Sequence, residues 1–249
     1  MRVFETKISE SELPVVKKLG LLWNAEMDQL TFNVKPVDIE SNYTKRLFVS
    51  RHYSVFDPLG FLSPYSIRGK IVLQEIWLEE TEWDERLSKD LQTNVKTWLS
   101  EMPSLSQVKI DRNMNITENS QIHTFVDTSS EASGAVVYTC TENDNNVNFV
   151  ISKSWVAPLK SVSIPRLELV GAVFGLQLTQ KVCTALKTDM TKVIFWSDSM
   201  NVLWWIHGHC RQFKNFVANR IWMIHLETKP QQWRYVPTKQ NATDGIISV

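Results

Sequence analysis

Apolar residues recur every three or four positions in some segments of the chain and alternate with polar residues in others, which predicts both helices and strands. Helical spacing is clearest in residues 85–101, where we predict a helix with Asp84 as its N-cap. Residues 109–121 are polar without a clear period, and we interpret them as a linker. The other elements predicted before this linker are two short strands within residues 19–34, a structured loop at residues 57–64 and a helix over residues 67–80.

After the linker, three strands come first and then alternate with helices. Strands are predicted over residues 122–127, 134–140, 147–156, 192–197 and 232–236, and helices over residues 165–186, 198–206 and 213–226. Polar residues 142–146 predict a hairpin turn between the second and third of these strands. This order predicts an α/β fold with a mixed five-stranded sheet and flanking helices.

Two domains are therefore expected. Residues 1–120 would form a smaller, mainly helical region, and residues 121–249 would form the α/β domain. Lys and Arg minus Asp and Glu give 15 − 18 = −3 for residues 1–120 and 12 − 9 = +3 for residues 121–249. This contrast favours two units but does not by itself indicate nucleic-acid binding.

Cysteine usage and apolar runs bear on the cellular compartment. Cys140, Cys183 and Cys210 are widely spaced, so neither a disulfide framework nor a zinc site is indicated. The N-terminal residues lack the apolar core of a signal peptide, and no apolar run approaches the ~18 residues that span a bilayer. We predict a soluble, intracellular protein without a membrane partner.

Four carboxylates fall where predicted strands end or predicted helices begin. They are Asp127 at the end of a strand, Glu168 in the first turn of a helix, and Asp198 and Asp244 after two further strands. In an α/β sheet such positions meet at one edge, so the four side chains can converge. Because like charges repel, convergence requires divalent cations, and oxygen ligands suit Mg²⁺ or Mn²⁺. Two such ions ~3.5–4 Å apart promote phosphodiester hydrolysis.

Each acid taken alone also has a purely structural interpretation. Asp198 and Asp244 precede predicted helices and suit helix N-caps. Glu168 would favour the helix dipole, and Asp127 would bind the amides of a turn. Only the joint placement of the four favours a catalytic site.

Several strings resemble the ribonuclease H domain of Pao/BEL-type LTR retrotransposon polyproteins. They are TFVDTSSEASGAVVY (124–138), PRLELVGAV (165–173), FWSDSMNVLWWI (195–206) and FKNFVANRIWMI…QWRYVPTKQNATD (213–244). Upstream, LGLLWNAEMDQLTF and SRHYSVFDPLGFLSPYSIRGKIVLQEIWLEETEWDE resemble the segment that follows the polymerase palm in the same polyproteins, catalogued as a "Pao retrotransposon peptidase". The resemblance spans nearly the whole chain and implies a thumb/connection remnant at residues 1–120 and a ribonuclease H-like domain at residues 121–249.

The resemblance also implies roles for individual residues. The family's Asp-Glu-Asp-Asp quartet maps onto the four acids, which implies that Asp127 bridges both metals, that Glu168 and Asp198 complete the leaving-group site, and that Asp244 holds the metal bearing the nucleophilic water. Contacts to the nucleic acid are implied for Ser129, Asn201, Arg166 and Lys153.

The activity implied is endonucleolytic hydrolysis of the RNA strand of an RNA–DNA hybrid by two Mg²⁺ or Mn²⁺ ions. The expected partners are the hybrid and the reverse transcriptase palm region of the parent polyprotein, and no small-molecule cofactor is expected. The expected location is the cytoplasm, in a virus-like particle, or the nucleus.

The sequence departs from the family pattern near its fourth acid. The family usually has Asn-Pro-Ala-Asp where this chain has Asn241-Ala242-Thr243-Asp244, followed by Gly245, a poor residue for starting a helix. The chain continues only with Gly-Ile-Ile-Ser-Val, so we expect the last helix, which should carry Asp244, to be nearly absent and the domain to be C-terminally truncated. Two alternatives stay open: a catalytically inactive nucleic-acid-binding or interaction remnant, and an aspartic peptidase, because Asp127-Thr128-Ser129 resembles an Asp-Thr/Ser-Gly triplet.

Overall fold

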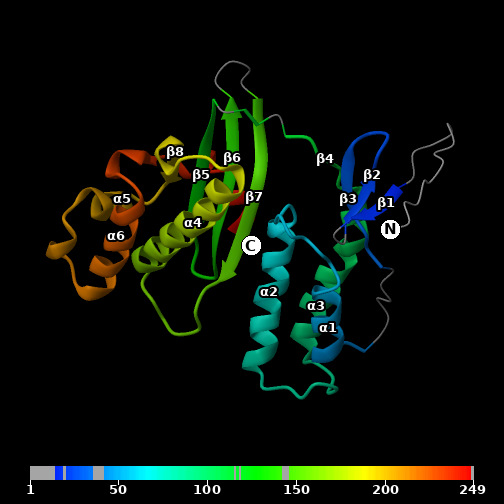
Figure 1. Cartoon of the computed structure of the whole chain (residues 1–249). Coiled ribbons are helices and arrows are strands. Elements are labelled where there is room, and N and C mark those ends of the chain that lie inside the picture. Colours follow the sequence, from blue (N-terminus) through cyan, green and yellow to red (C-terminus); the bar gives the residue numbers. More distant parts are fainter. Residues whose placement is uncertain are drawn as a thin grey trace, which may run out of the picture. The chain divides into compact units, whose positions relative to one another are not determined.

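The computed structural model describes residues 15–18, 21–35, 42–114, 116–117, 119–141 and 146–247. Their contacts divide the chain into two compact units (Figure 1). The first unit consists of residues 1–58 and 72–114, and the second of residues 59–71 and 115–249. Residues 59–71 thus group with the second unit, although the sequence analysis placed them in the first domain. The predicted hairpin turn at 142–146 lies almost wholly outside the described residues.

The first unit contains a small antiparallel sheet and three helical segments. The sheet has the order β1-β2-β3-β4, formed by β1 (Val15–Lys18), β2 (Leu21–Asn24), β3 (Gln29–Phe32) and β4 (Ile110–Asp111). The helices are α1 (Lys45–His52), α3 (Lys89–Glu101) and the second half of α2 (Ser63–Leu78). The predicted pair of strands is confirmed as β2 and β3, whereas β1, β4 and α1 were not predicted.

Helix α3 begins later than its sequence pattern suggested. Its N-cap is Ser88, whose Oγ accepts a hydrogen bond from the backbone N–H of Leu91 at 3.4 Å. The predicted cap, Asp84, is wrong because its carboxylate instead pairs with Arg46 at 2.7 Å. Arg86 forms an antiparallel bridge with Thr44, so the chain is extended where the helix was expected to begin.

The second unit confirms the predicted mixed five-stranded sheet. Its order is β7-β6-β5-β8-β9, with antiparallel pairs on the β7 side of β5 and parallel pairs from β5 to β9. The strands are β5 (Ser120–Thr128), β6 (Ala132–Thr141), β7 (Asn146–Val156), β8 (Val193–Ser197) and β9 (Trp233–Tyr235). The helices are α4 (Ile164–Leu186), α5 (Met200–His207), α6 (Asn215–Glu227) and the short α7 (Asp244–Ile247).

One face of this sheet is covered by α4, which lies across β5 and β6 (Figure 1). A Cβ atom at Gly171 would overlap Thr128 Oγ1, so the absence of a side chain lets the helix approach the strand closely. The hydroxyls of Thr124 and Thr179 add a hydrogen bond of 2.6 Å between strand and helix. Helix α4 has the length and apolar composition of a membrane span, but 56% of its most apolar window is buried inside the protein, as expected of a core helix.

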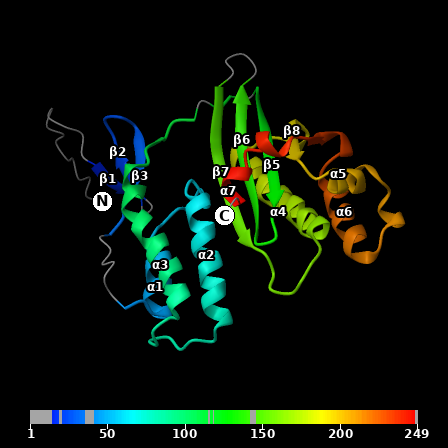
Figure 2. The same ribbon diagram turned by 180° about the vertical axis from the view of Figure 1, so that it is seen from behind.

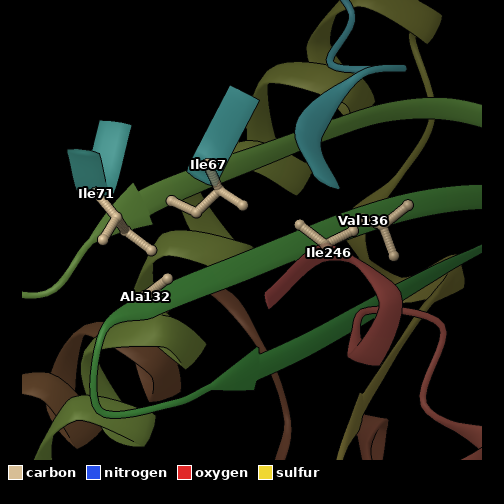
Figure 3. Packing of buried hydrophobic residues seen from close by; sticks show 5 residues of the cluster. All are labelled: Ile67, Ile71, Ala132, Val136 and Ile246. Carbon is tan, nitrogen blue, oxygen red and sulfur yellow. The ribbon is translucent and has the colours of Figure 1, made fainter. Parts of the chain in front are cut away.

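The opposite face is covered in part by segments that are far apart in the sequence. Ile67 and Ile71 of α2 pack with Ala132 and Val136 of β6 and with Ile246 of α7 (Figure 3). Figure 2 shows α7 on this side of the sheet, against β6. The cluster therefore anchors the short helix that begins with Asp244.

A loop from the first half of the sequence covers the edge strand β7. The backbone N–H of Ser152 donates to the carbonyl of Leu59 at 2.9 Å, and the Ser152 hydroxyl donates to Ser63 Oγ at 2.7 Å. Between them Gly60 has a φ of +74°, and a Cβ atom there would overlap the Ser152 carbonyl oxygen. The structured loop predicted at residues 57–64 is confirmed, but α2 begins inside it, at Ser63 rather than near Ile67.

We predict that Gly60→Ala destabilises the second unit by about 2 kcal/mol or more, because it combines a left-handed backbone with a backbone clash. Urea unfolding followed by tryptophan fluorescence would measure the loss. The control is Gly245→Ala, since a Cβ atom at Gly245 meets nothing within 4 Å. Equal unfolding midpoints for the two variants would contradict the prediction.

Candidate active site

Two of the predicted acids leave the sheet from neighbouring parallel strands. β5 and β8 pair in parallel, and Val126 lies opposite Ser197 in their register. The residue after each of these two is an acid: Asp127 follows Val126, and Asp198 follows Ser197. Parallel pairing therefore brings both acids to the same sheet edge, where α/β folds bind ligands.

Glu168 joins this pair from α4. It lies one turn before Gly171, where a Cβ atom would overlap Thr128 Oγ1 at the end of β5. One small pocket is lined by Asp127, Glu168 and Asp198 together with Val126, Thr128 and Ser197. The structure therefore brings three predicted site residues together from three segments.

Asp244 does not line this pocket, but a buried asparagine fixes the segment that precedes it. Asn241 Nδ2 donates to the carbonyl of Val126 at 3.1 Å, next to Asp127 in the chain. Asn241 Oδ1 accepts from the hydroxyl of Thr243 at 2.5 Å and from its backbone N–H at 3.2 Å. Asn241 and Thr243 are 4% and 0% exposed, so this clamp is shielded from water. The charge of Asp244 accordingly acts on Asp127.

Each of the other three acids has its own hydrogen-bond donor. Glu168 Oε2 accepts from Ser199 Oγ at 2.7 Å, and Asp198 Oδ2 accepts from Thr238 Oγ1 at 2.8 Å. Asp127 Oδ1 accepts from the backbone N–H of Thr128 at 2.6 Å. These donors orient the carboxylates.

The structure rules out the N-cap interpretation of Asp198. The N-cap of α5 is Ser199, whose Oγ accepts from the backbone N–H of Val202 at 3.3 Å. Ser199 thus caps α5 and also donates a hydrogen bond to Glu168. Asp198 does not cap the helix, and it lines the pocket instead.

Burial and the neighbouring acids raise the pKa values of Asp127 and Glu168. Burial, followed by the charge of Asp198, raises the pKa of Asp127 to about 6, and Asp244 and Glu168 contribute in the same direction. Burial also raises the pKa of Glu168, with a further rise from Asp198, while the hydrogen bond from Ser199 opposes it. The pocket therefore holds more negative charge than its own residues balance.

The chemistry of these residues fits a divalent cation in charge and donor type. The polar side chains that line the pocket carry only carboxylate and hydroxyl oxygens, which belong to the donor set of Mg²⁺ and Mn²⁺. Within the described ranges, however, no group of three or more His, Cys, Asp or Glu side chains is arranged to hold an ion. Binding would therefore require the carboxylate oxygens to move closer together.

The four residues proposed to contact nucleic acid do not line this pocket. Ser129 Oγ accepts from the backbone N–H groups of Glu131 and Ala132, so it shapes the turn between β5 and β6. Asn201 is exposed in the first turn of α5. The Arg166 guanidinium lies 5.3 Å from the Phe216 ring, and the Lys153 ammonium lies 5.6 Å from the Trp155 ring.

Sequence reasoning missed three residues of the site: Ser199, Thr238 and Asn241. A serine that follows an acid and precedes a helix is a recognisable N-cap signal, so Ser199 was accessible to prediction. Asn241 stood within the compared motif, but nothing in the sequence indicates that it binds Val126. Thr238 carries no such signal, because its partner lies 40 residues away.

A mixed five-stranded sheet with flanking helices and acids at the ends of β5 and β8 defines a ribonuclease H-like fold. The model of the family "Pao retrotransposon-like RNaseH-like domain" matches residues 44–199, which is more than half of the chain. The protein belongs to this retroelement family.

The fold is also similar to solved structures at low sequence identity. A foamy viral protease-reverse transcriptase in complex with dsDNA shares 10% identity at a TM-score of 0.51, and the similarity covers 89% of this chain and 44% of that one. The chain thus spans less than half of that viral protein. The N-terminal ribonuclease H domain of a Mycobacterium tuberculosis protein, fused to maltose binding protein, shares 14% identity at a TM-score of 0.37, covering 52% of this chain and 95% of that one. Comparison with curated proteins found no match.

We predict that Asp127→Asn stabilises the metal-free protein at neutral pH. The folded-state pKa of about 6 exceeds the ordinary value of 3.8, so the native state loses stability as pH rises from about 4 to 6 and Asp127 ionises. The amide carries no charge, so the variant avoids this loss. Because solvent screens the site in part, the gain in the free energy of unfolding should be about 1–2 kcal/mol. Thermal unfolding in EDTA should show the gain at pH 8 and none below about pH 4. A variant that is no more stable at pH 8 would contradict this assignment.

Asn241→Ala should both destabilise the second unit and loosen Asp244. Loss of the buried bond to the Val126 carbonyl costs about 1–3 kcal/mol. The pKa of Asp127 should also fall, because the Asp244 charge is no longer held near it. NMR titration of the Asp127 carboxyl and urea unfolding measure the two effects, with exposed Asn201→Ala as the matched control. Unchanged titration would show that Asn241 does not position Asp244.

Proposed function

We propose that the second unit is a ribonuclease H-type nuclease that hydrolyses the RNA strand of RNA–DNA hybrids with Mg²⁺ or Mn²⁺. The observation that carries this proposal is the position of three acids from separate segments around the buried carboxyl of Asp127, where their charges add to the effect of burial in raising its pKa to about 6. No cation is among the residues that line the pocket, so the charge there favours bound divalent ions. Family membership supports the same class of activity.

In this mechanism Asp127, Glu168, Asp198 and Asp244 hold two ions. When bound, the ions supply a water of lowered pKa and stabilise the leaving oxygen of the scissile phosphodiester. Ser199 and Thr238 restrict the rotation of Glu168 and Asp198. Asp127 binds a proton below about pH 6, so its availability as a ligand increases as the pH rises through that value. The expected products carry 3′-hydroxyl and 5′-phosphate ends.

Recognition of the hybrid would rest on residues around the pocket. The foamy viral protein with a similar fold was solved with dsDNA, and we extend nucleic-acid binding to this chain as part of the proposal. Asn201 lies three residues after Asp198, on exposed surface, and suits contact with a 2′-hydroxyl. Arg166 and Lys153 are exposed cations suited to phosphates, while Ser129 would contribute through the turn that it shapes.

The wider context follows from the retroelement family. We propose that the first unit is a thumb/connection remnant and that its partner is the reverse transcriptase palm region of the parent polyprotein. The protein would then act in the cytoplasm, within a virus-like particle, or in the nucleus.

A second candidate function is a catalytically inactive module that binds the hybrid. One observation favours it: the described residues contain no group already arranged to hold an ion. The two candidates share a binding partner and differ in chemistry, so one experiment separates them.

The chain should cleave the RNA strand of a labelled RNA–DNA hybrid when Mg²⁺ or Mn²⁺ is present and should not cleave it in EDTA. Asp127→Asn should lower the rate by about 100-fold or more while the hybrid still binds. At Mg²⁺ concentrations that do not saturate the site, the rate should rise between pH 5 and 7, because protons and the ion compete for Asp127. Gel analysis of the products measures all three effects.

Asp189→Asn is the matched control, since Asp189 is exposed and lies before β8, at the end of the strand away from Asp198. It should leave cleavage unchanged. Hybrid binding without metal-dependent cleavage in the parent chain would favour the inactive module.

A further inference from the structure

The first unit contains a cationic groove that the proposed nuclease does not use. Its volume is about 1050 Å³, and it is lined by the start and one face of α3 and by the segment before that helix. Among the described residues no Asp or Glu lines it, although residues 1–120 have a net charge of −3. The lining includes the cations Arg86, Lys89 and Lys96 and the hydroxyls of Ser88, Thr93 and Thr97.

The periodicity of α3 gives the groove its charge. Lys89, Thr93 and Lys96 lie on one side of the helix, and all three are exposed. The opposite side of α3 is buried in the first unit through Leu91, Val95, Trp98 and Leu99. Lys89 and Lys96 are seven residues apart, or two turns, which separates them by about 10.5 Å along the axis.

The two lysines are not neutralised by ion pairs with other described residues. In the part of the chain that the structure describes, no carboxylate pairs with Lys89 or Lys96. Of the acids near this segment, Asp84 pairs with Arg46, and Glu79 accepts a hydrogen bond at 2.7 Å from Ser88, one of the residues that line the groove.

Arg86 is held in place just before the N-terminus of α3. Its Nη2 donates to Gln92 Oε1 at 3.3 Å, and Gln92 Nε2 donates to the carbonyl of Leu87 at 2.7 Å. Its backbone is held by the bridge to Thr44. The groove therefore has an ordered cation at one end and two free ammonium groups along its side.

We propose that this groove binds the sugar–phosphate backbone of a nucleic acid. The spacing of the two lysines spans about three phosphates of one strand, at ~3.4 Å each along the helix axis. Cations spread along a groove suit a polyanion better than a single phosphate, on which they would have to converge. The choice of nucleic acid over another polyanion rests on the proposed function. Contacts to phosphate alone would make this binding independent of base sequence.

The test compares hybrid binding by the full chain carrying Asp127→Asn, with and without Lys89→Gln and Lys96→Gln. Fluorescence anisotropy over a range of salt concentrations gives the slope of log K against log salt. Losing two phosphate contacts should reduce the magnitude of that slope by about 2 and weaken binding about tenfold at moderate salt. Lys89→Arg with Lys96→Arg should restore both, because the charge returns.

The matched control is Lys35→Gln with Lys109→Gln, which removes the same charge from exposed lysines of the same unit outside the groove. A slope equal to that of the control, or no hybrid binding by the parent chain, overturns the inference. So does a change confined to binding of phosphatidylserine vesicles, which would make a membrane the occupant. Groove-dependent binding without cleavage would leave the inference standing while the nuclease proposal fails, and cleavage with control-like binding would do the reverse.

Discussion

Electrostatic repulsion among carboxylates is the constraint on which the second unit depends. Parallel pairing of β5 with β8 forces Asp127 and Asp198 to leave one sheet edge together, and close packing of α4 at Gly171 adds Glu168. Burial of the Asp127 carboxyl and the negative charges beside it together raise its pKa, which shows the electrostatic cost of this arrangement. Strain of this kind is typical of sites selected for chemistry rather than for stability.

The elements of the second unit were predictable because their signals are local. Alternation along β5 and β6 and the long apolar side of α4 follow from the period of each element. Segments fixed by distant contacts gave no such signal. Asp84 and Ser88 are both acceptable helix caps by residue type, and only the pairing of Asp84 with Arg46 decides between them. The loop around Gly60 likewise takes its shape from a strand some 90 residues later.

The candidate site shows the same division between local and distant information. Its acids were identified from their places at strand and helix ends, together with the resemblance to a family. The groups that hold those acids were not, because Ser199 and Thr238 bind carboxylates 31 and 40 residues away in the chain. Hydroxyl residues are common, and nothing in their local sequence distinguishes a carboxylate partner from water.

The apolar cluster of Figure 3 has a consequence for where the ribonuclease H-like domain can be separated from its neighbours. Ile67 and Ile71 precede β5 by some 50 residues, yet they cover Ala132 and Val136 and support Ile246 beside Asp244. A fragment that begins at residue 121 would expose this patch to water. It would also lack the α2 side chains against which α7 packs. The smallest autonomous piece must therefore include the segment around residues 59–71, so the functional boundary lies upstream of the first strand of the sheet.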